Sequence, residues 1–160
     1  MDSQKFKQEA IKVTLKIMDA DPIDWKTFND NLNTIVFETE QNTPRFSVKN
    51  IKKDEKLILE YFEGNNLLHI TTQRVIFNNC QMLLSNVKGF KNTHEHDNYK
   101  QHDGSYAKKH LIIIDGEDGK RLQYEIDSHH PAFFSKFLIL NMSCFIKKGR
   151  WYMNPSKSYR

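Results

Sequence analysis

The side chains of this chain that could carry out chemistry are concentrated in one polar stretch, residues 91–109. Its candidate metal ligands are His94, Glu95, His96, Asp97, His102 and Asp103. Alternating imidazole and carboxylate groups can ligate a divalent metal, so a metal-dependent hydrolase is one hypothesis. The i, i+2 spacing on a loop does not pre-form a tetrahedral site, and no neighbouring group is placed to orient the imidazoles. We therefore expect adventitious metal affinity only, and no cofactor.

The remaining candidate catalytic residues have simpler structural explanations. His129 and His130 stand directly before Pro131 and are interpreted as the start of a helix rather than as an acid–base pair. Cys80 and Cys144 are far apart and lack a CxxC spacing, so we expect reduced, partly buried thiols. The six glycines are scattered and form no phosphate-binding loop. Because no catalytic motif is present, the sequence predicts a protein that is not an enzyme.

The C-terminal segment is the strongest candidate for contact with a charged partner. It combines three cations with two aromatic rings, namely Lys147, Lys148, Arg150, Trp151 and Tyr152. The cations could bind phosphates while the rings stack on bases or enter a lipid interface. A disordered or locally packed terminus is the favoured alternative. The net charge of +4 also leans towards acidic partners, although the 24 basic and 20 acidic residues are largely interspersed.

Length and composition indicate one globular domain, or one domain with an appendage. The chain has 160 residues, of which 38% are hydrophobic and 11 are phenylalanine, so it can bury a core. Its first residues do not resemble a secretion signal, and no apolar run approaches the roughly 20 residues that a membrane span needs. We expect a cytoplasmic protein without a transmembrane segment.

The N-terminal part of the chain has helical periodicity. Apolar residues recur at three- and four-residue steps over 6–18, which predicts an amphipathic helix. Asp21 and Pro22 are typical of the start of a second helix, although 34–37 could separate from it as a strand. The polar tract 38–44 ends in a proline, so we place the boundary of a helical extension near residue 43. This extension could cover a strand edge, or its apolar stripe could recruit a partner or a second copy.

The rest of the chain alternates short apolar runs with turn residues, which is typical of antiparallel strands. An apolar pair stands at Val87 and Phe90, and the predicted strands cover residues 55–62, 67–70, 75–77, 81–84, 110–114 and 120–126. The last two are joined by Asp115–Gly119 as a hairpin. Residues 91–109 form a long loop in this interpretation. A final amphipathic helix begins at 128–131 and ends at Gly149, with one apolar face towards the sheet.

This order of elements resembles that of bacterial pleckstrin-homology-like (PH-like, or GRAM-like) domains. Three stretches support the resemblance: Asp54–Leu59 as an acidic lead-in to a strand, Ile70–Phe77 as a threonine-turn-arginine corner, and Met82–Phe90 as an apolar strand followed by a turn. The resemblance covers roughly 46–147. It implies an α+β, mainly β fold, a barrel of two antiparallel sheets capped by a C-terminal helix. Residues 1–42 would be the helical extension, 43–148 the barrel with its helix, and 149–160 a basic, aromatic tail.

The resemblance implies a noncatalytic interaction module that acts through protein–protein contact or self-association. Members that bind phosphoinositides use clustered lysine and arginine after the first strand, but here that turn is Glu63–Asn66, which disfavours inositol phosphates. The Thr71–Arg74 corner has a structural explanation, because threonine caps turns and the arginine stem can lie along the sheet. Peripheral binding to anionic lipid or nucleic acid through the C-terminal segment is the alternative function.

Overall fold

The computed structural model describes residues 1–18, 33–38, 43–91, 109–128 and 130–152. Within these ranges lie two α-helices, eight strands and a short 3-10 helix. In chain order they are α1 (Ser3–Ile17), β1 (Thr34–Val36), β2 (Leu57–Glu63), β3 (Asn66–Thr71), β4 (Arg74–Phe77), β5 (Cys80–Leu83), η1 (Leu84–Asn86), β6 (Val87–Phe90), β7 (Lys109–Gly116), β8 (Arg121–Asp127) and α3 (His130–Lys148). The fold is α+β, with helices at both ends of the chain around antiparallel strands.

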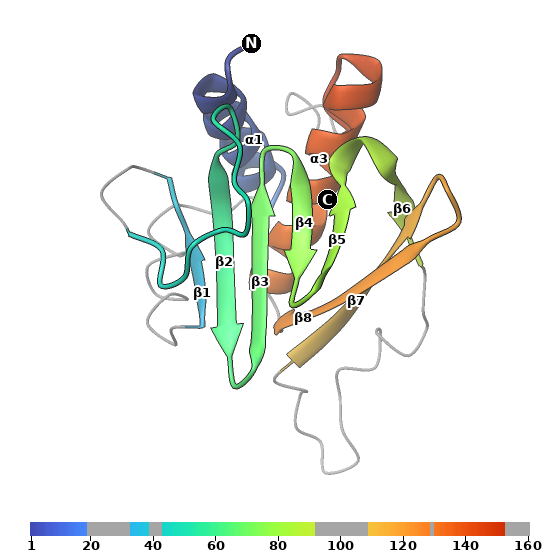
Figure 1. The fold of residues 1–160 in the computed structure, drawn as a ribbon. Coiled ribbons are helices and arrows are strands. Elements are labelled where there is room, and N and C mark those ends of the chain that lie inside the picture. The colour runs from blue at the N-terminus through green and yellow to red at the C-terminus, as the bar shows by residue number, and fades with distance from the viewer. Residues whose placement is uncertain (19–32, 39–42, 92–108, 129, 153–160) are drawn as a thin grey trace.

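The strands form two antiparallel sheets (Figure 1). The first has the order β1-β2-β3-β4-β5, and the second has the order β6-β7-β8. The two predicted antiparallel sheets are confirmed, and among the described residues no strand of one sheet is paired with a strand of the other, so the sheets pack together without closing into a barrel. The chain leaves the first sheet through η1, and β6 then pairs with β7 instead of extending β5.

Side chains on the two faces of the five-stranded sheet differ sharply in polarity. Because successive strand residues point to opposite faces, the register separates two rows. Leu59, Ile70, Val75 and Met82 lie opposite one another on the inner face and belong to the hydrophobic core. The next row is Glu60, His69, Ile76 and Gln81, on the outer face. The sheet thus buries polar groups on the face directed away from the core.

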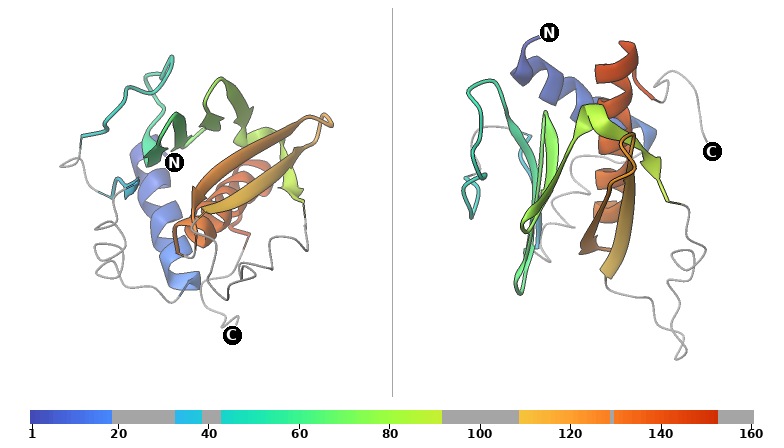
Figure 2. Two further views of the ribbon diagram at one scale, coloured as in Figure 1. Left: turned by 90° about the horizontal axis from the view of Figure 1, so that it is seen from below. Right: turned by 45° about the vertical axis from the view of Figure 1, so that its right-hand side comes forward.

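The two helices pack against each other beside the sheets (Figure 2). Asp2 caps α1 by accepting a hydrogen bond from the Lys5 backbone N–H at 2.8 Å. The α3 helix ends at Lys148 and is followed by Gly149, whose φ of +71° is the left-handed conformation that terminates helices. Where the helices meet, the buried Asn141 amide donates to the Thr14 hydroxyl at 3.3 Å.

The predicted helices at 6–18 and 128–149 and the predicted strands are confirmed, with ends shifted by a few residues. Residues 34–36 form strand β1, as the alternative interpretation of that stretch had it. The predicted helix after Asp21 and the predicted loop 91–109 lie largely outside the described residues. Strand β1 pairs with β2, so one sheet includes residues from both sides of the boundary that the sequence placed near residue 43.

No helix in the described part of the chain is long and apolar enough to cross a bilayer.

Candidate functional site

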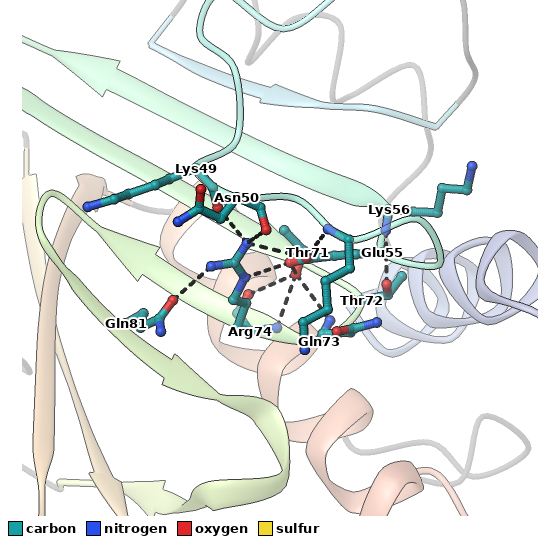
Figure 3. A network of polar contacts seen from close by, with 10 residues as sticks. Lys49, Asn50, Glu55, Lys56, Thr71, Thr72, Gln73, Arg74 and Gln81 are labelled. Carbon is teal, nitrogen blue, oxygen red and sulfur yellow. Dashed lines mark hydrogen bonds and ion pairs between the residues drawn. The ribbon is translucent and has the colours of Figure 1, made fainter.

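The Thr71–Arg74 corner is a buried polar network (Figure 3). The Thr71 hydroxyl accepts hydrogen bonds from the backbone N–H groups of Gln73 and Arg74, both at 3.1 Å, and lies 2.7 Å from a carboxylate oxygen of Glu55. Thr72 accepts from the Lys56 backbone N–H at 3.0 Å. The prediction that threonine caps this turn is therefore confirmed.

The Arg74 side chain is buried and joins its own strand β4 to β5 and to the segment that precedes β2. Its Nε donates to Glu55 Oε1 at 2.8 Å, its Nη1 to Gln81 Oε1 at 2.7 Å, and its Nη2 to the Lys49 carbonyl at 2.6 Å. The sequence interpretation placed only the arginine stem against the sheet and missed the guanidinium partner. The available signal was Glu55, an acidic residue at the start of a predicted strand.

Glu55 stays ionised because its partners outweigh its burial. Burial raises the pKa of this carboxyl. Hydrogen bonds from Arg74, Thr71 and the Lys52 backbone N–H lower the pKa by more than burial raises it, so the net pKa lies below the ordinary value. A buried carboxylate with a charged partner and several donors is costly to disrupt, because removing one partner leaves the other charged and unpaired.

A second buried carboxylate, Glu60, organises the outer face of the sheet. It accepts hydrogen bonds from Arg45 Nε at 2.9 Å, from the Arg45 backbone N–H at 3.1 Å and from the Phe46 backbone N–H at 3.2 Å. His69 Nε2, on β3, lies 2.8 Å from Glu60 Oε2, the oxygen that also accepts from Phe46. Burial raises the pKa of Glu60, and these hydrogen bonds together hold it below its usual value.

Both carboxylates fasten the same segment, residues 43–56, which we call the strap. Glu60 holds the strap near Arg45, while Arg74 donates to the carbonyls of Lys49 and Asn50 and pairs with Glu55, which is itself part of the strap. The Phe46 ring also packs on Phe62, with centroids 4.5 Å apart. The two carboxylates and Arg74 thus use their hydrogen bonds to position the backbone of the strap against the sheet.

A third polar cluster joins the two sheets. Asp127, at the end of β8, accepts hydrogen bonds from the Thr34 hydroxyl of β1 at 3.1 Å and from Lys109. Lys109 also forms an ion pair with Glu63 of β2. Burial, together with the negative charge of Asp127, raises the pKa of the neighbouring Tyr61 to about 12, so this phenol stays neutral at physiological pH. The hydrogen bonds and ion pairs of Asp127 and Lys109 thus connect β7 and β8 of one sheet to β1 and β2 of the other.

An open groove lies where the two helices meet the turns at one end of the five-stranded sheet. We call it the helix-end groove; its volume is about 810 Å³. Its walls are formed by Met1, Asp2, Ser3, Phe6, Lys52, Asp54, Thr72, Gln73, Leu83, Ser85, Phe145 and Ile146. Three large apolar side chains in it remain exposed to solvent: Met1 at 65%, Leu83 at 50% and Ile146 at 43%. The groove combines an apolar wall with a polar rim, as ligand-binding clefts commonly do.

The structure divides the predicted lipid or nucleic-acid contacts into two groups. Lys147 is held by the Val87 carbonyl and by Glu117. Trp151 packs against Phe6 and Phe145, with ring centroids 5.8 and 4.4 Å apart.

The other members of the predicted set, Lys148, Arg150 and Tyr152, are exposed. The five residues therefore do not form one free surface, because two of them stabilise the end of α3 and its contact with α1.

Most of the histidine-containing candidate sites fall outside the described residues. His94, Glu95, His96, Asp97, His102 and Asp103 lie outside the described residues. His130 is the first residue of α3, as predicted.

The two cysteines differ in exposure. Cys144 is buried on α3. The prediction of partial burial is wrong for Cys80, which is exposed because it begins the edge strand β5 after a tight turn.

No protein-family model matches the chain, and searches of curated proteins and of solved structures gave no significant match.

Proposed function

We propose that this chain is a noncatalytic binding module on a pleckstrin-homology-like scaffold that works through protein–protein contact at the helix-end groove. Two features of the fold support the scaffold: consecutive antiparallel strands are divided between two sheets, and an amphipathic C-terminal helix packs against them. Fold alone does not define a partner, so the binding surface must be argued from its own residues.

The observation that carries the proposal is the exposed apolar wall of the groove. Isolated exposed apolar residues are ordinary, but Leu83 and Ile146 come from segments far apart in the chain and line the same cleft. The groove volume of about 810 Å³ lies within the rough range of 300–1,000 Å³ for binding clefts. A partner side chain placed there would bury apolar surface on both molecules.

The buried ionisable groups support a noncatalytic role. Catalytic acids and bases are presented to a substrate, whereas Glu55 and Glu60 direct their oxygens at donors of the strap and the sheet. The buried carboxylates Glu55 and Glu60 therefore stabilise the scaffold, and the open groove offers a partner an apolar contact.

A random peptide library displayed on phage, selected on the immobilised protein, tests this proposal. We expect selected peptides to lose about tenfold in affinity for the variant Ile146→Lys, because the change places a charge in the apolar wall. The matched control is Ile51→Lys, since Ile51 is similarly exposed, at 48%, but does not line the groove. Failure to select any peptide, or equal losses in the two variants, would contradict the proposal.

A second candidate function is supported by the exposure of Lys148, Arg150 and Tyr152 at the end of α3. These side chains could contact anionic lipid or nucleic acid. Such binding depends steeply on salt, because counterions are released when phosphates are neutralised. Binding of single-stranded DNA or phosphatidylserine vesicles that weakens steeply with salt and is lost in Lys148→Ala/Arg150→Ala would favour this function over the groove.

A further inference from the structure

Strand β5 leaves one edge of the five-stranded sheet available to another chain. Among the residues that the structure describes, it is the last strand in the sheet order and pairs only with β4. Its residues Cys80, Gln81 and Leu83 are exposed, while Met82 points into the core. Open edges are the places where an extended peptide can add to a sheet.

The direction of the free backbone groups follows from the register of β4 and β5. Leu83 lies opposite Arg74, and the next residue, Leu84, donates its N–H to the Gln73 carbonyl at 2.8 Å. The Leu83 carbonyl accepts the first hydrogen bond of η1. Antiparallel pairs alternate between bonded and non-bonded positions, so the N–H groups of Leu83 and Gln81 and the Gln81 C=O point away from β4. They are oriented to bond a further strand.

A second groove runs along β5 on the outer face of the sheet, with a volume of about 460 Å³. Its walls are formed by Lys49, Asn50, Lys52, Gln73, Arg74, Ile76, Asn78, Asn79, Cys80, Gln81 and Leu83. Lys52, Gln73 and Leu83 also line the helix-end groove, so the two grooves adjoin. A peptide paired with β5 would extend directly towards the apolar wall around Ile146.

The groove along β5 is basic. Its three cationic lining residues are Lys49, Lys52 and Arg74, and none of its lining residues is acidic. Glu55 neutralises Arg74, but in the described part of the chain neither Lys49 nor Lys52 forms an ion pair. Strand addition would place every second side chain of the peptide on this face, beside the two ammonium groups.

We infer that the partner is an extended peptide segment that adds to β5 as a further strand, with acidic side chains towards Lys49 and Lys52 and an apolar side chain in the helix-end groove. This inference rests on the proposed protein-binding function and specifies the chemistry of the partner. A peptide fits the site better than a membrane surface does, because the apolar side chains line a concave groove and the neighbouring strand offers directional backbone groups.

Position 83 separates backbone pairing from side-chain contact. Leu83 has φ −67°, which proline adopts without strain, and its N–H is not used by β4. Leu83→Pro therefore removes one outward donor, whereas Leu83→Ala removes a similar amount of side chain and keeps the donor. We expect eight-residue peptides selected from the random library to bind Leu83→Pro about fivefold more weakly than Leu83→Ala.

The peptides themselves supply the reciprocal test. Methylating the backbone nitrogens that pair with β5 should weaken binding to the wild type, while methylating the alternate nitrogens should not. Charge is tested with Lys49→Glu/Lys52→Glu, which should lower the affinity for acidic peptides by about tenfold. Lys12→Glu is the control, because Lys12 is exposed on α1 and lines neither groove.

The outcomes distinguish this inference from the function on which it rests. Peptides that depend on Ile146 but bind Leu83→Pro and Leu83→Ala equally would overturn strand addition and leave the groove as a binding site. Selected peptides without acidic residues would overturn the charge assignment. A selection that yields no peptide would overturn both proposals. Stronger binding to phosphatidylserine vesicles than to any peptide would overturn them as well. So would a dimer, detected by light scattering, whose interface occupies β5.

Discussion

The outer face of the five-stranded sheet and the helix-end groove use opposite chemistry. Beneath the strap, Glu60 and His69 are buried and bonded to each other, and Glu60 is bonded to Arg45. In the groove, Leu83 and Ile146 are apolar and exposed. A buried polar network with its partners in place holds one conformation, whereas exposed apolar surface lowers its free energy only when something covers it. The comparison assigns stability to the buried network beneath the strap and binding to the exposed groove.

The largest effect on stability is expected from Glu60→Ala. The change removes the carboxylate that His69 and Arg45 both contact. Removing one partner of a buried charged pair lowers the free energy of unfolding by about 3–5 kcal/mol. Urea unfolding followed by circular dichroism measures the change in unfolding free energy. Glu117→Ala is the control, because Glu117 pairs with Lys147 on the surface and its loss should cost about 0–1 kcal/mol. Equal costs would contradict the assignment.

A smaller loss is expected when the corner loses its cap. Thr71→Val keeps the shape of the side chain but removes the acceptor for two backbone N–H groups and the contact with Glu55, at a cost of about 2 kcal/mol. Thr72→Val removes one acceptor, for Lys56, and should cost about 1 kcal/mol. The same unfolding measurement compares them, and a reversed order would show that the cap at Thr71 contributes little.

Acid should loosen the strap. The folded-state pKa values of Glu55 and Glu60 lie below the ordinary value of 4.5 for a glutamate, so these groups add stability above the unfolded-state pKa. That stability is lost as the pH falls through the folded-state pKa values. Urea unfolding between pH 7 and acid should therefore show a steeper decline for the wild type than for Glu60→Gln. Parallel curves would mean that Glu60 ionisation does not stabilise the fold.

The smallest effect on stability is expected in the groove. Ile146→Lys should change the unfolding free energy by no more than about 0.5 kcal/mol, because the side chain is exposed. The same variant is expected to lose peptide binding. A large loss of stability would mean that Ile146 belongs to the packing of α3, and the contrast between strap and groove would no longer hold.

Local patterns in the sequence predicted most of the elements. The apolar steps of α1 and α3 and the turn residues between β2 and β3 depend on near neighbours, which the sequence shows directly. The capping role of Thr71 was predictable for the same reason, since its acceptor serves the next residues in the chain.

The partners of the buried charges were not predictable in this way. Glu60 meets His69 only because β2 and β3 adopt one particular register, and it meets Arg45 only because the strap folds back over the sheet. Cys80 was expected to be partly buried, but the sheet order leaves β5 at the edge.

By itself, the sequence determined the succession of helices and strands and the residues able to form a core, because periodicity and turn chemistry act over a few residues. Only the tertiary structure decided which apolar side chains stay exposed and where they gather. The helix-end groove combines the start of α1, the β3–β4 turn, the end of β5 and the end of α3, segments separated by many residues. Their meeting depends on packing between distant elements, which no local pattern records.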